Sequence, residues 1–367
     1  MQSKGEACHE GLSETGSENI ETATPQVTRE GALMVAQLIA SHLWKIGFMD
    51  FTQAFMSGDN IDRALYTSQP REGVPGMQPG QLLKLEKVCY GLVDGPFCWF
   101  QHLRKLLVDT LGYEQSLADP CIYYKHIKAT EGRRLSGVIA VATDDLLHGG
   151  DEHHMKCMEQ IKDTYKLGKF QFGHGKFTGK YFRQKENFRI EVKQENYVKD
   201  KLINIELTKQ RKRQRYSMCD EKEISTLRAS VGALAWLAKE TRPDLAGRVA
   251  LLQQAFPRPR VLDLLEANAL TLEAKQTATS GIVLMPIPIE RLRVGVATDA
   301  SCGNSRDREQ LEDGKDDFWE ETSSFWICHH IKPRRTLFHP GADLGPELQT
   351  LLPSRKTMTD GGQTVED

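Results

Sequence analysis

Several features that mark secreted, membrane-spanning or repetitive proteins are absent from this sequence of 367 residues. It contains no run of about 18 apolar residues, which argues against a membrane-spanning helix, and its first residues include no apolar segment of a signal peptide. The eight cysteines form no Cys-x-x-Cys pair, so we expect reduced thiols and an intracellular location. The sequence also lacks a Walker-type phosphate loop and a fixed internal repeat, which excludes P-loop enzymes and repeat arrays.

Charge is unevenly distributed along the chain, although the formal net charge is only −2. Residues 1–30 hold six acidic and two basic residues and are rich in Ser, Thr and Gly, a composition typical of disorder. Residues 156–216 hold 17 basic and 7 acidic residues, a net of +10, and include five cations between Lys209 and Arg215. This basic segment fits a surface for a polyanion, and it equally fits a solvated helix face, a linker or a nuclear-import signal.

Hydrophobic periodicity predicts helices and strands in alternation. Helical spacing is found at 28–43, 99–111, 152–165 and 227–238, and residues 241–244 match a capping box that opens a helix through Leu252. Short apolar segments predict strands at 45–50, 121–124, 135–141, 146–148, 170–182, 188–192 and 291–300. Prolines and glycines predict a loop over residues 69–80.

Three carboxylates stand at the ends of these predicted strands. Asp50 ends one strand, and Asp144 with Asp145 occupies the tip of a hairpin. If the two elements are neighbours, the carboxylates converge at one sheet edge, where their repulsion calls for a divalent cation. Two Mg²⁺ ions about 3.5–4 Å apart among such groups provide the arrangement that nucleotidyl transfer uses. The alternative is that Asp144 and Asp145 are ordinary turn residues and that Asp50 caps a strand.

A series of short motifs between residues 28 and 256 resembles the reverse-transcriptase region of copia-type retrotransposon Pol polyproteins. The family pattern Asp-x-x-x-Ala-Phe-x-x-Gly-Asp occupies residues 50–59. Further matches follow in the family's order: Leu65-Tyr66, Gln69-Pro70, residues 85–92 with Trp99, Leu111-Gly112-Tyr113, Gln115-Ser116, Asp119-Pro120-Cys121, Asp144-Asp145, Arg228 with Val231-Gly232, and Thr241-Arg242-Pro243-Asp244. The resemblance implies an RNA-directed DNA polymerase.

Carried onto this sequence, the resemblance implies that Asp50, Asp144 and Asp145 are the catalytic and metal-binding residues. It implies nucleotide-binding positions at Phe51, Phe55 and Asp94. Phe55 would pack under the sugar of the incoming nucleotide and select deoxynucleotides, and a buried core phenylalanine is the alternative. Four lysines are candidates for contacts with the nucleic-acid backbone: Lys169, Lys176, Lys180 and Lys185.

Three departures from the family pattern argue against activity. The family's Tyr-x-Asp-Asp has Ala142 in place of the tyrosine that supports the primer end. Asp94 stands where the family has a glutamine, and a carboxylate there would repel nucleotide phosphates. Only about 50 residues precede Asp50, so we expect the basic fingers of the polymerase to be largely missing.

Residues 291–345 resemble a truncated ribonuclease H module. Asp299, at the end of the predicted strand 291–300, resembles the first carboxylate of that module, and the later blocks are not recognisable. The acidic stretch 306–321, with eight acidic and three basic residues, fits a solvated loop better than a second ligand set. We therefore expect a ribonuclease H remnant.

Two groups of histidines and cysteines are candidates for a zinc site. His148, His153, His154 and Cys157 form the first group, and residues 328–330 with His339 form the second. Neither has the paired ligand spacing of a structural zinc site, so we expect ordinary buried or exposed side chains.

These observations predict an α+β chain with five parts. They are a disordered leader (1–27), a polymerase palm with an antiparallel sheet and helices on one face (28–195), a helical thumb or connection (196–290), a partial ribonuclease H-like α/β segment (291–345) and a tail (346–367).

The predicted function is RNA-directed DNA polymerisation, with Mg²⁺ or alternatively Mn²⁺ as cofactor. The expected partners are an RNA template, a DNA primer and deoxynucleoside triphosphates, with no membrane. The rival hypothesis is a catalytically inactive retroelement remnant that at most binds nucleic acid through its basic face. The sequence does not predict an oligomeric state.

Overall fold

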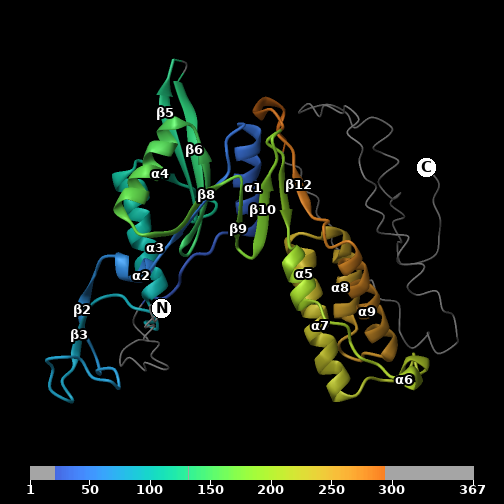
Figure 1. Ribbon diagram of the computed structural model, residues 1–367. Coiled ribbons are helices and arrows are strands. Elements are labelled where there is room, and N and C mark those ends of the chain that lie inside the picture. The colour runs from blue at the N-terminus through green and yellow to red at the C-terminus, as the bar shows by residue number, and fades with distance from the viewer. Residues whose placement is uncertain (1–20, 131, 294–367) are drawn as a thin grey trace, which may run out of the picture. The chain divides into compact units, whose positions relative to one another are not determined.

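The main element of the first half of the fold is a six-stranded antiparallel sheet (Figure 1). Its strand order is β4-β5-β6-β7-β1-β8. The computed structural model describes residues 21–130 and 132–293, apart from the side chain of residue 62. The strands of this sheet are β1 (Gly47–Phe51), β4 (Glu114–Gln115), β5 (Ile122–Ala129), β6 (Gly132–Ala142), β7 (Asp145–Gly150) and β8 (Leu167–Phe172). The short strand β1 therefore lies between β7 and β8, although both follow it by about 100 residues in the sequence.

Alternating side chains of β6 face two separate hydrophobic cores, as the two-residue period of a strand requires. Ile139 and Val141 pack with helices α3 (Gly95–Lys105) and α4 (Glu152–Thr164) on one face. Val138 and Ala140 pack with α1 (Arg29–Ser41) and with the second sheet on the other face. The prediction of helices on one face only is wrong, because the β-branched run in β6 is apolar on both sides.

The second sheet has four antiparallel strands in the order β12-β11-β10-β9. They are β9 (His174–Phe177), β10 (Lys180–Gln184), β11 (Ile190–Lys193) and β12 (Ile282–Leu284). A separate hairpin of β2 (Asn60–Thr67) and β3 (Leu83–Lys87) follows the short helix α2 (Ala54–Ser57). The predicted loop over residues 69–80 lies between these two strands and contains no helix or strand.

Helices dominate the part of the fold after β11. They are α5 (Glu195–Lys201), α6 (Lys209–Arg213), α7 (Glu221–Glu240), α8 (Ala246–Gln254) and α9 (Val261–Gln276), with short 3₁₀ turns at Pro243–Leu245 and Ile289–Arg291. The predicted apolar face of α7 is confirmed, since Leu227, Val231 and Leu234 are buried. No helix among residues 21–130 and 132–293 is long and apolar enough to cross a membrane.

The start of α8 differs from the sequence-based expectation. Thr241 does not cap α8; its hydroxyl donates instead to the side-chain oxygen of Gln194, and Pro243 opens a 3₁₀ turn before the helix. The capping box of this region is Asp220 with Glu223, at the start of α7. The predicted helix 99–111 also begins earlier, at Gly95, and ends in a π-helical turn, Leu106–Thr110.

Candidate active site

The pairing of β1 with β7 brings the three predicted carboxylates together. Asp50 in β1 is the direct cross-strand partner of Asp145 in β7, and Asp144 precedes it in the turn between β6 and β7. Side chains directly opposite each other in an antiparallel pair lie on the same face, with Cβ atoms about 4.5–5.5 Å apart. The structure thus makes the Asp50 strand a neighbour of the hairpin, which is the condition that the sequence left open.

The turn that presents Asp144 is held by the backbone and by one tryptophan. Thr143 has a φ of 54°, an unusual left-handed conformation for a β-branched residue. The indole nitrogen of Trp99 donates to the carbonyl oxygen of Thr143 over 2.8 Å, and the amide of Phe51 donates to the carbonyl of Asp144 over 3.1 Å. Trp99 is 1% exposed, so the core of α3 fixes the turn. Sequence reasoning noted Trp99 only as part of a motif and missed this contact.

Gly168 makes room for the carboxylate of Asp50. The β1–β8 register shifts between Asp50 and Phe51, which pair with Lys169 and Leu167 and leave Gly168 between them. A Cβ atom on Gly168 would stand 2.4 Å from Oδ2 of Asp50, closer than any real contact. A larger residue at this position would displace the carboxylate, and a glycine in a strand is the sequence signal for such an approach.

Burial and neighbouring negative charge make Asp144 and Asp145 difficult to ionise. Burial raises the pKa of Asp145 to about 6, and the charges of Asp144 and Asp50 contribute further to this rise. Burial also raises the pKa of Asp144, again with a contribution from Asp50. Lys169 opposes both shifts and Lys176 opposes that of Asp145, which places these two exposed lysines within electrostatic reach of the carboxylates.

The donor chemistry of this cluster suits a hard divalent cation. Three carboxyl groups supply oxygen ligands only, which Mg²⁺ and Mn²⁺ prefer over nitrogen or sulfur. The raised pKa values of Asp144 and Asp145 show that a positive charge beside them would relieve an unfavourable interaction. Across the ranges that the structure describes, however, no three acidic, histidine or cysteine side chains are gathered at ligand distance, so a cation would have to draw the carboxylates together.

The two phenylalanines near the triad have different surroundings. Phe51 is buried, with ring centroids 5.0 Å from Trp99 and 5.5 Å from Tyr165, so it is a core residue rather than a nucleotide contact. Phe55, in α2, is half-buried and meets the exposed Tyr90 edge to face at 4.9 Å. Sequence reasoning missed Tyr90, which supplies a second aromatic ring beside the predicted sugar position.

Asp94 is neutralised by a partner that the sequence did not reveal. Its carboxylate forms a two-point ion pair with the guanidinium of Arg63 in β2, and its side chain is only 4% exposed. The hydrogen bonds from Arg63 lower the pKa of Asp94 below its ordinary range. The expected repulsion of nucleotide phosphates is therefore offset by the paired cation.

The four lysines that were predicted to contact the nucleic-acid backbone differ in exposure and in ion pairing. Lys169 and Lys176 are exposed on β8 and β9, and Lys185 pairs with Glu191 at 3.5 Å. Lys180 is 2% exposed and its ammonium group pairs with the buried Glu240 in α7. Lys180 is thus a correction to the sequence analysis, because a phosphate cannot reach a side chain that is committed to a buried ion pair.

Two members of the first histidine group, His148 and His154, lie in a buried hydrogen-bonded chain. Nδ1 of His148 lies 3.0 Å from Nε2 of His154, and Nδ1 of His154 lies 2.7 Å from the hydroxyl of Tyr113. Burial lowers the pKa of His148 to about 3 and that of His154 well below its ordinary value. His153 is exposed, and the described residues contain no metal-binding group at this place. Asp299 and the second histidine group lie outside the described residues.

Comparison with known proteins defines the class to which this fold and site belong. The family model described as reverse transcriptase (RNA-dependent DNA polymerase) matches residues 2–215. The chain is a member of this family.

The relatives narrow this class to the copia-type retrotransposons. The retrovirus-related Pol polyprotein from transposon RE1 of Arabidopsis thaliana is 25% identical over 253 residues, 66% of this chain and 17% of that protein. The corresponding polyprotein from transposon RE2 is 26% identical over the same length, and a transposon Ty5-1 protein of Saccharomyces cerevisiae is 25% identical over 60% of this chain and 73% of its own length. The resemblance to a copia-type reverse-transcriptase region is confirmed.

This chain covers 17% of the length of the two Arabidopsis polyproteins that it matches. The similarity therefore concerns a small part of those polyproteins, and the reverse-transcriptase family model accounts for residues 2–215 of this chain.

Proposed function

We propose that this chain is an RNA-directed DNA polymerase of a copia-type retrotransposon, with Asp50, Asp144 and Asp145 holding two divalent cations. The observation that carries the proposal is the gathering of three carboxylates, two with raised pKa values, at one end of β1 and β7. Structural carboxylates in this chain have cations or amide donors as partners, as Asp94 and Asp220 do. A cluster of like-charged groups whose pKa values are raised by burial and by one another is typical of a ligand site.

Each residue near the cluster has a role in this proposal. Bound Mg²⁺ would activate the primer 3′-hydroxyl and stabilise the leaving pyrophosphate. The β1–β7 pairing, Trp99 and Gly168 position the carboxylates, and Lys169 and Lys176 lie where they would contact phosphates. Phe55 with Tyr90 would bound the sugar position and crowd a 2′-hydroxyl. Residues 28–195 would then form the palm and 196–290 the thumb or connection.

A catalytically inactive remnant that binds nucleic acid is the second candidate. Ala142 leaves the turn without the family's tyrosine, and the Arg63–Asp94 ion pair occupies a position where the family has an amide. Both departures concern the primer and the nucleotide rather than the cations. The remnant hypothesis therefore predicts that the carboxylates still bind a divalent cation while no DNA is made.

Primer extension separates the two candidates. The purified chain is given a DNA primer on an RNA template with Mg²⁺ and deoxynucleoside triphosphates, beside the variants Asp144→Asn and Asp163→Asn. Asp163 is an exposed carboxylate on α4 and serves as the matched control. We expect extension by the wild type and by the control, and a loss of more than about 100-fold in Asp144→Asn. No extension by a folded wild type would contradict the polymerase proposal and favour the remnant.

A further inference from the structure

A lysine and a cysteine meet at the edge of the core between β5 and α4. The ammonium group of Lys125 in β5 donates to Sγ of Cys157 in α4 over 3.2 Å. Lys125 follows Tyr123 by two residues, so both side chains lie on the same face of the sheet. Tyr123 and Cys157 belong to the apolar core on this face. The alternation of the strand therefore brings an amine nitrogen to a sulfur atom that the carboxylate site does not use.

Two further contacts keep the nitrogen of Lys125 in this place. The ammonium group donates to the carbonyl of Leu111, which caps the π-helical turn. It also lies 5.2 Å from the centre of the Tyr113 ring, a favourable position for a cation. These contacts restrict the rotamers of a long side chain, so the nitrogen stays beside the sulfur.

The buried histidine chain directs the hydroxyl of Tyr113 toward the same sulfur. Burial lowers the pKa values of His148 and His154, so each ring is neutral and carries one N–H. Nε2 of His148 is buried and has no hydrogen-bond partner among the described residues. Because buried N–H groups without an acceptor are rare, the proton of His148 belongs on Nδ1, which donates to His154. His154 then donates from Nδ1 to the oxygen of Tyr113, whose own proton is left for Cys157.

The sulfur of Cys157 thus lies between a phenol and an ammonium group. Burial raises the pKa of Tyr113, and Cys157 raises it further by its charge and by a hydrogen bond, so the phenol remains a donor at neutral pH. Cys157 is 7% exposed, which leaves an opening for a small solute. Reactive cysteines are found in electropositive surroundings of this kind that are partly open to solvent.

Burial holds three other thiols in their protonated form. It raises the pKa of Cys121 and that of Cys219 to about 12, and it also raises the pKa of Cys89. A protonated thiol is a poor nucleophile. We therefore expect these positions to react slowly, although Cys89 and Cys219 are more exposed than Cys157.

We propose that Cys157 and Lys125 form a covalent cross-link when the chain meets a hydroperoxide. In the first step the sulfur attacks hydrogen peroxide and the O–O bond breaks. The sulfur is oxidised by two electrons to a sulfenic acid, and the second oxygen takes the thiol proton and leaves as water. In the second step Lys125 gives one proton to the hydroxyl group on the sulfur, which leaves as water while the nitrogen lone pair forms an S–N bond. Another proton passes from the nitrogen to solvent, and the product is a sulfenamide, which sulfenic acids are known to form with nitrogen.

The cross-link would join α4 to β5 across 32 residues of the chain, which include the hairpin that presents Asp144 and Asp145. A link of this kind restricts the unfolded chain and so stabilises the folded state. A thiol reductant attacks the sulfur, breaks the S–N bond and restores both side chains. The proposed site is therefore a reversible, peroxide-dependent modification that is separate from the carboxylate site.

The test treats the reduced full chain with hydrogen peroxide, digests it without reductant and maps the linked peptides by mass spectrometry. We expect the peptides that contain Lys125 and Cys157 to be joined, with a mass two hydrogen atoms below their sum. The test variants are Cys157→Ser and Lys125→Arg, the second of which keeps the positive charge. The matched controls are Cys89→Ser and Lys128→Arg, at an exposed position on the same strand.

Thermal unfolding supplies a second readout. Peroxide should raise the midpoint of unfolding by about 5 °C in the wild type and in both controls, and dithiothreitol should reverse the rise. Neither Cys157→Ser nor Lys125→Arg should show it. In Lys125→Arg we expect Cys157 to remain a sulfenic acid that dimedone labels, or to proceed to the sulfinic acid.

Three results would overturn the proposal, and the first two are read in the wild type alone. They are a Cys157 that stays reduced under peroxide, a linkage through a lysine other than Lys125, and the same oxidation product in the wild type and in Lys125→Arg. The reaction requires neither Mg²⁺ nor nucleic acid, so its outcome is independent of the polymerase proposal.

Discussion

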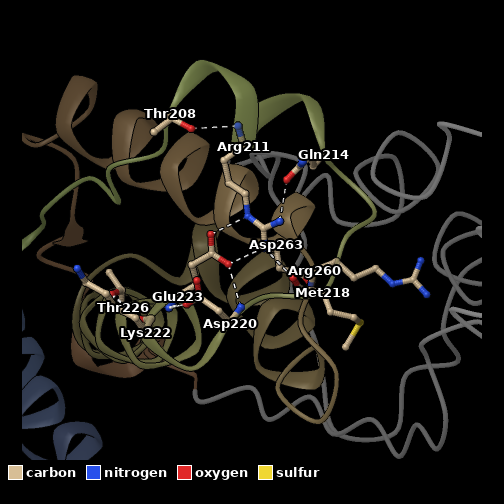
Figure 2. A network of polar contacts seen from close by, with 10 residues as sticks. All are labelled: Thr208, Arg211, Gln214, Met218, Asp220, Lys222, Glu223, Thr226, Arg260 and Asp263. Carbon is tan, nitrogen blue, oxygen red and sulfur yellow. Dashed lines mark hydrogen bonds and ion pairs between the residues drawn. The ribbon is translucent and has the colours of Figure 1, made fainter.

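Two clusters of charged side chains in this molecule follow opposite rules. Around Arg211 in α6, Glu223 accepts hydrogen bonds from the guanidinium and Asp220 accepts one from the amide of Glu223, and the hydrogen bonds from Arg211 lower the pKa of Glu223 (Figure 2). Around Asp50, carboxylates are gathered beside one another and burial raises the pKa values of Asp144 and Asp145. The first cluster stabilises the fold in which it occurs. The second cluster lowers the stability of the fold. Such an arrangement is typical of a functional site, where ligand binding offsets the unfavourable free energy.

The largest effect is expected on acidification, which acts in opposite directions on the carboxylates and on the two buried histidines, His148 in β7 and His154 in α4. His148 and His154 stay neutral in the folded state, whereas the unfolded chain protonates them below about pH 6.5. The free energy of unfolding therefore falls as the pH falls, by about 2 kcal/mol per histidine at pH 5. Asp145 acts in the opposite direction, because its folded pKa of about 6 lies above the unfolded value and protonation relieves its strain.

Urea unfolding at about pH 7 and pH 5 measures this difference. The loss on acidification should be steeper in Asp145→Asn, which lacks the opposing carboxyl, and shallower in His154→Gln. The exposed His153→Gln is the control and should behave like the wild type. A wild type whose stability rises toward pH 5 would show that the histidine pair is not buried in its neutral form.

Removal of the tryptophan anchor tests whether the carboxylate turn depends on the core. In Trp99→Phe the carbonyl of Thr143 loses its donor, and we expect the free energy of unfolding to fall by about 1–2 kcal/mol, with a loss of primer extension. Trp236→Phe, at an exposed position on α7, is the control and should change stability by less than about 0.5 kcal/mol. Equal effects of the two variants would mean that the indole contact does not hold the turn.

The smallest effects are expected when one carboxylate is neutralised in each cluster, and the two stability changes should have opposite signs. Glu223→Gln weakens the pairing with Arg211 and should destabilise the chain by about 1 kcal/mol. Asp145→Asn removes a repelled carboxylate and, after allowance for solvent screening, should stabilise the chain by about 1 kcal/mol. Thermal or urea unfolding at neutral pH without divalent cations measures both. Shifts of the same sign in the two variants would remove the distinction between the clusters.

Local patterns predicted much of the fold. The helical spacing in residues 28–43, 152–165 and 227–238 and the β-branched hairpin at 135–148 correspond to α1, α4, α7 and the β6–β7 hairpin. Helix α9 was missed, although Leu264, Ala267, Leu270 and Ala274 give its buried face a helical period. The adjacency of Asp50 to the hairpin tip depended on strand order, and only the family resemblance made it predictable.

Long-range partners were beyond the sequence. Arg63 and Asp94 are 31 residues apart, Trp99 and Thr143 are 44 apart, and Lys180 and Glu240 are 60 apart. Nothing in the local pattern indicates that Lys180 turns inward while Lys169 and Lys176 stay exposed, because each of the three stands between a glycine and an aromatic residue. Side-chain direction is decided by which element packs against a strand, and that is a property of the tertiary fold.

A titration of unfolding with Mg²⁺ tests most directly whether the carboxylate cluster exists to hold cations. A cation that binds only the folded state raises the free energy of unfolding by an amount that grows with its concentration. We predict that Mg²⁺ stabilises the wild type in this way and gives Asp144→Asn little or no stabilisation, while Asp163→Asn responds like the wild type. An equal response of the wild type and Asp144→Asn would contradict the account, because the cluster would then be a set of repelled side chains without a ligand.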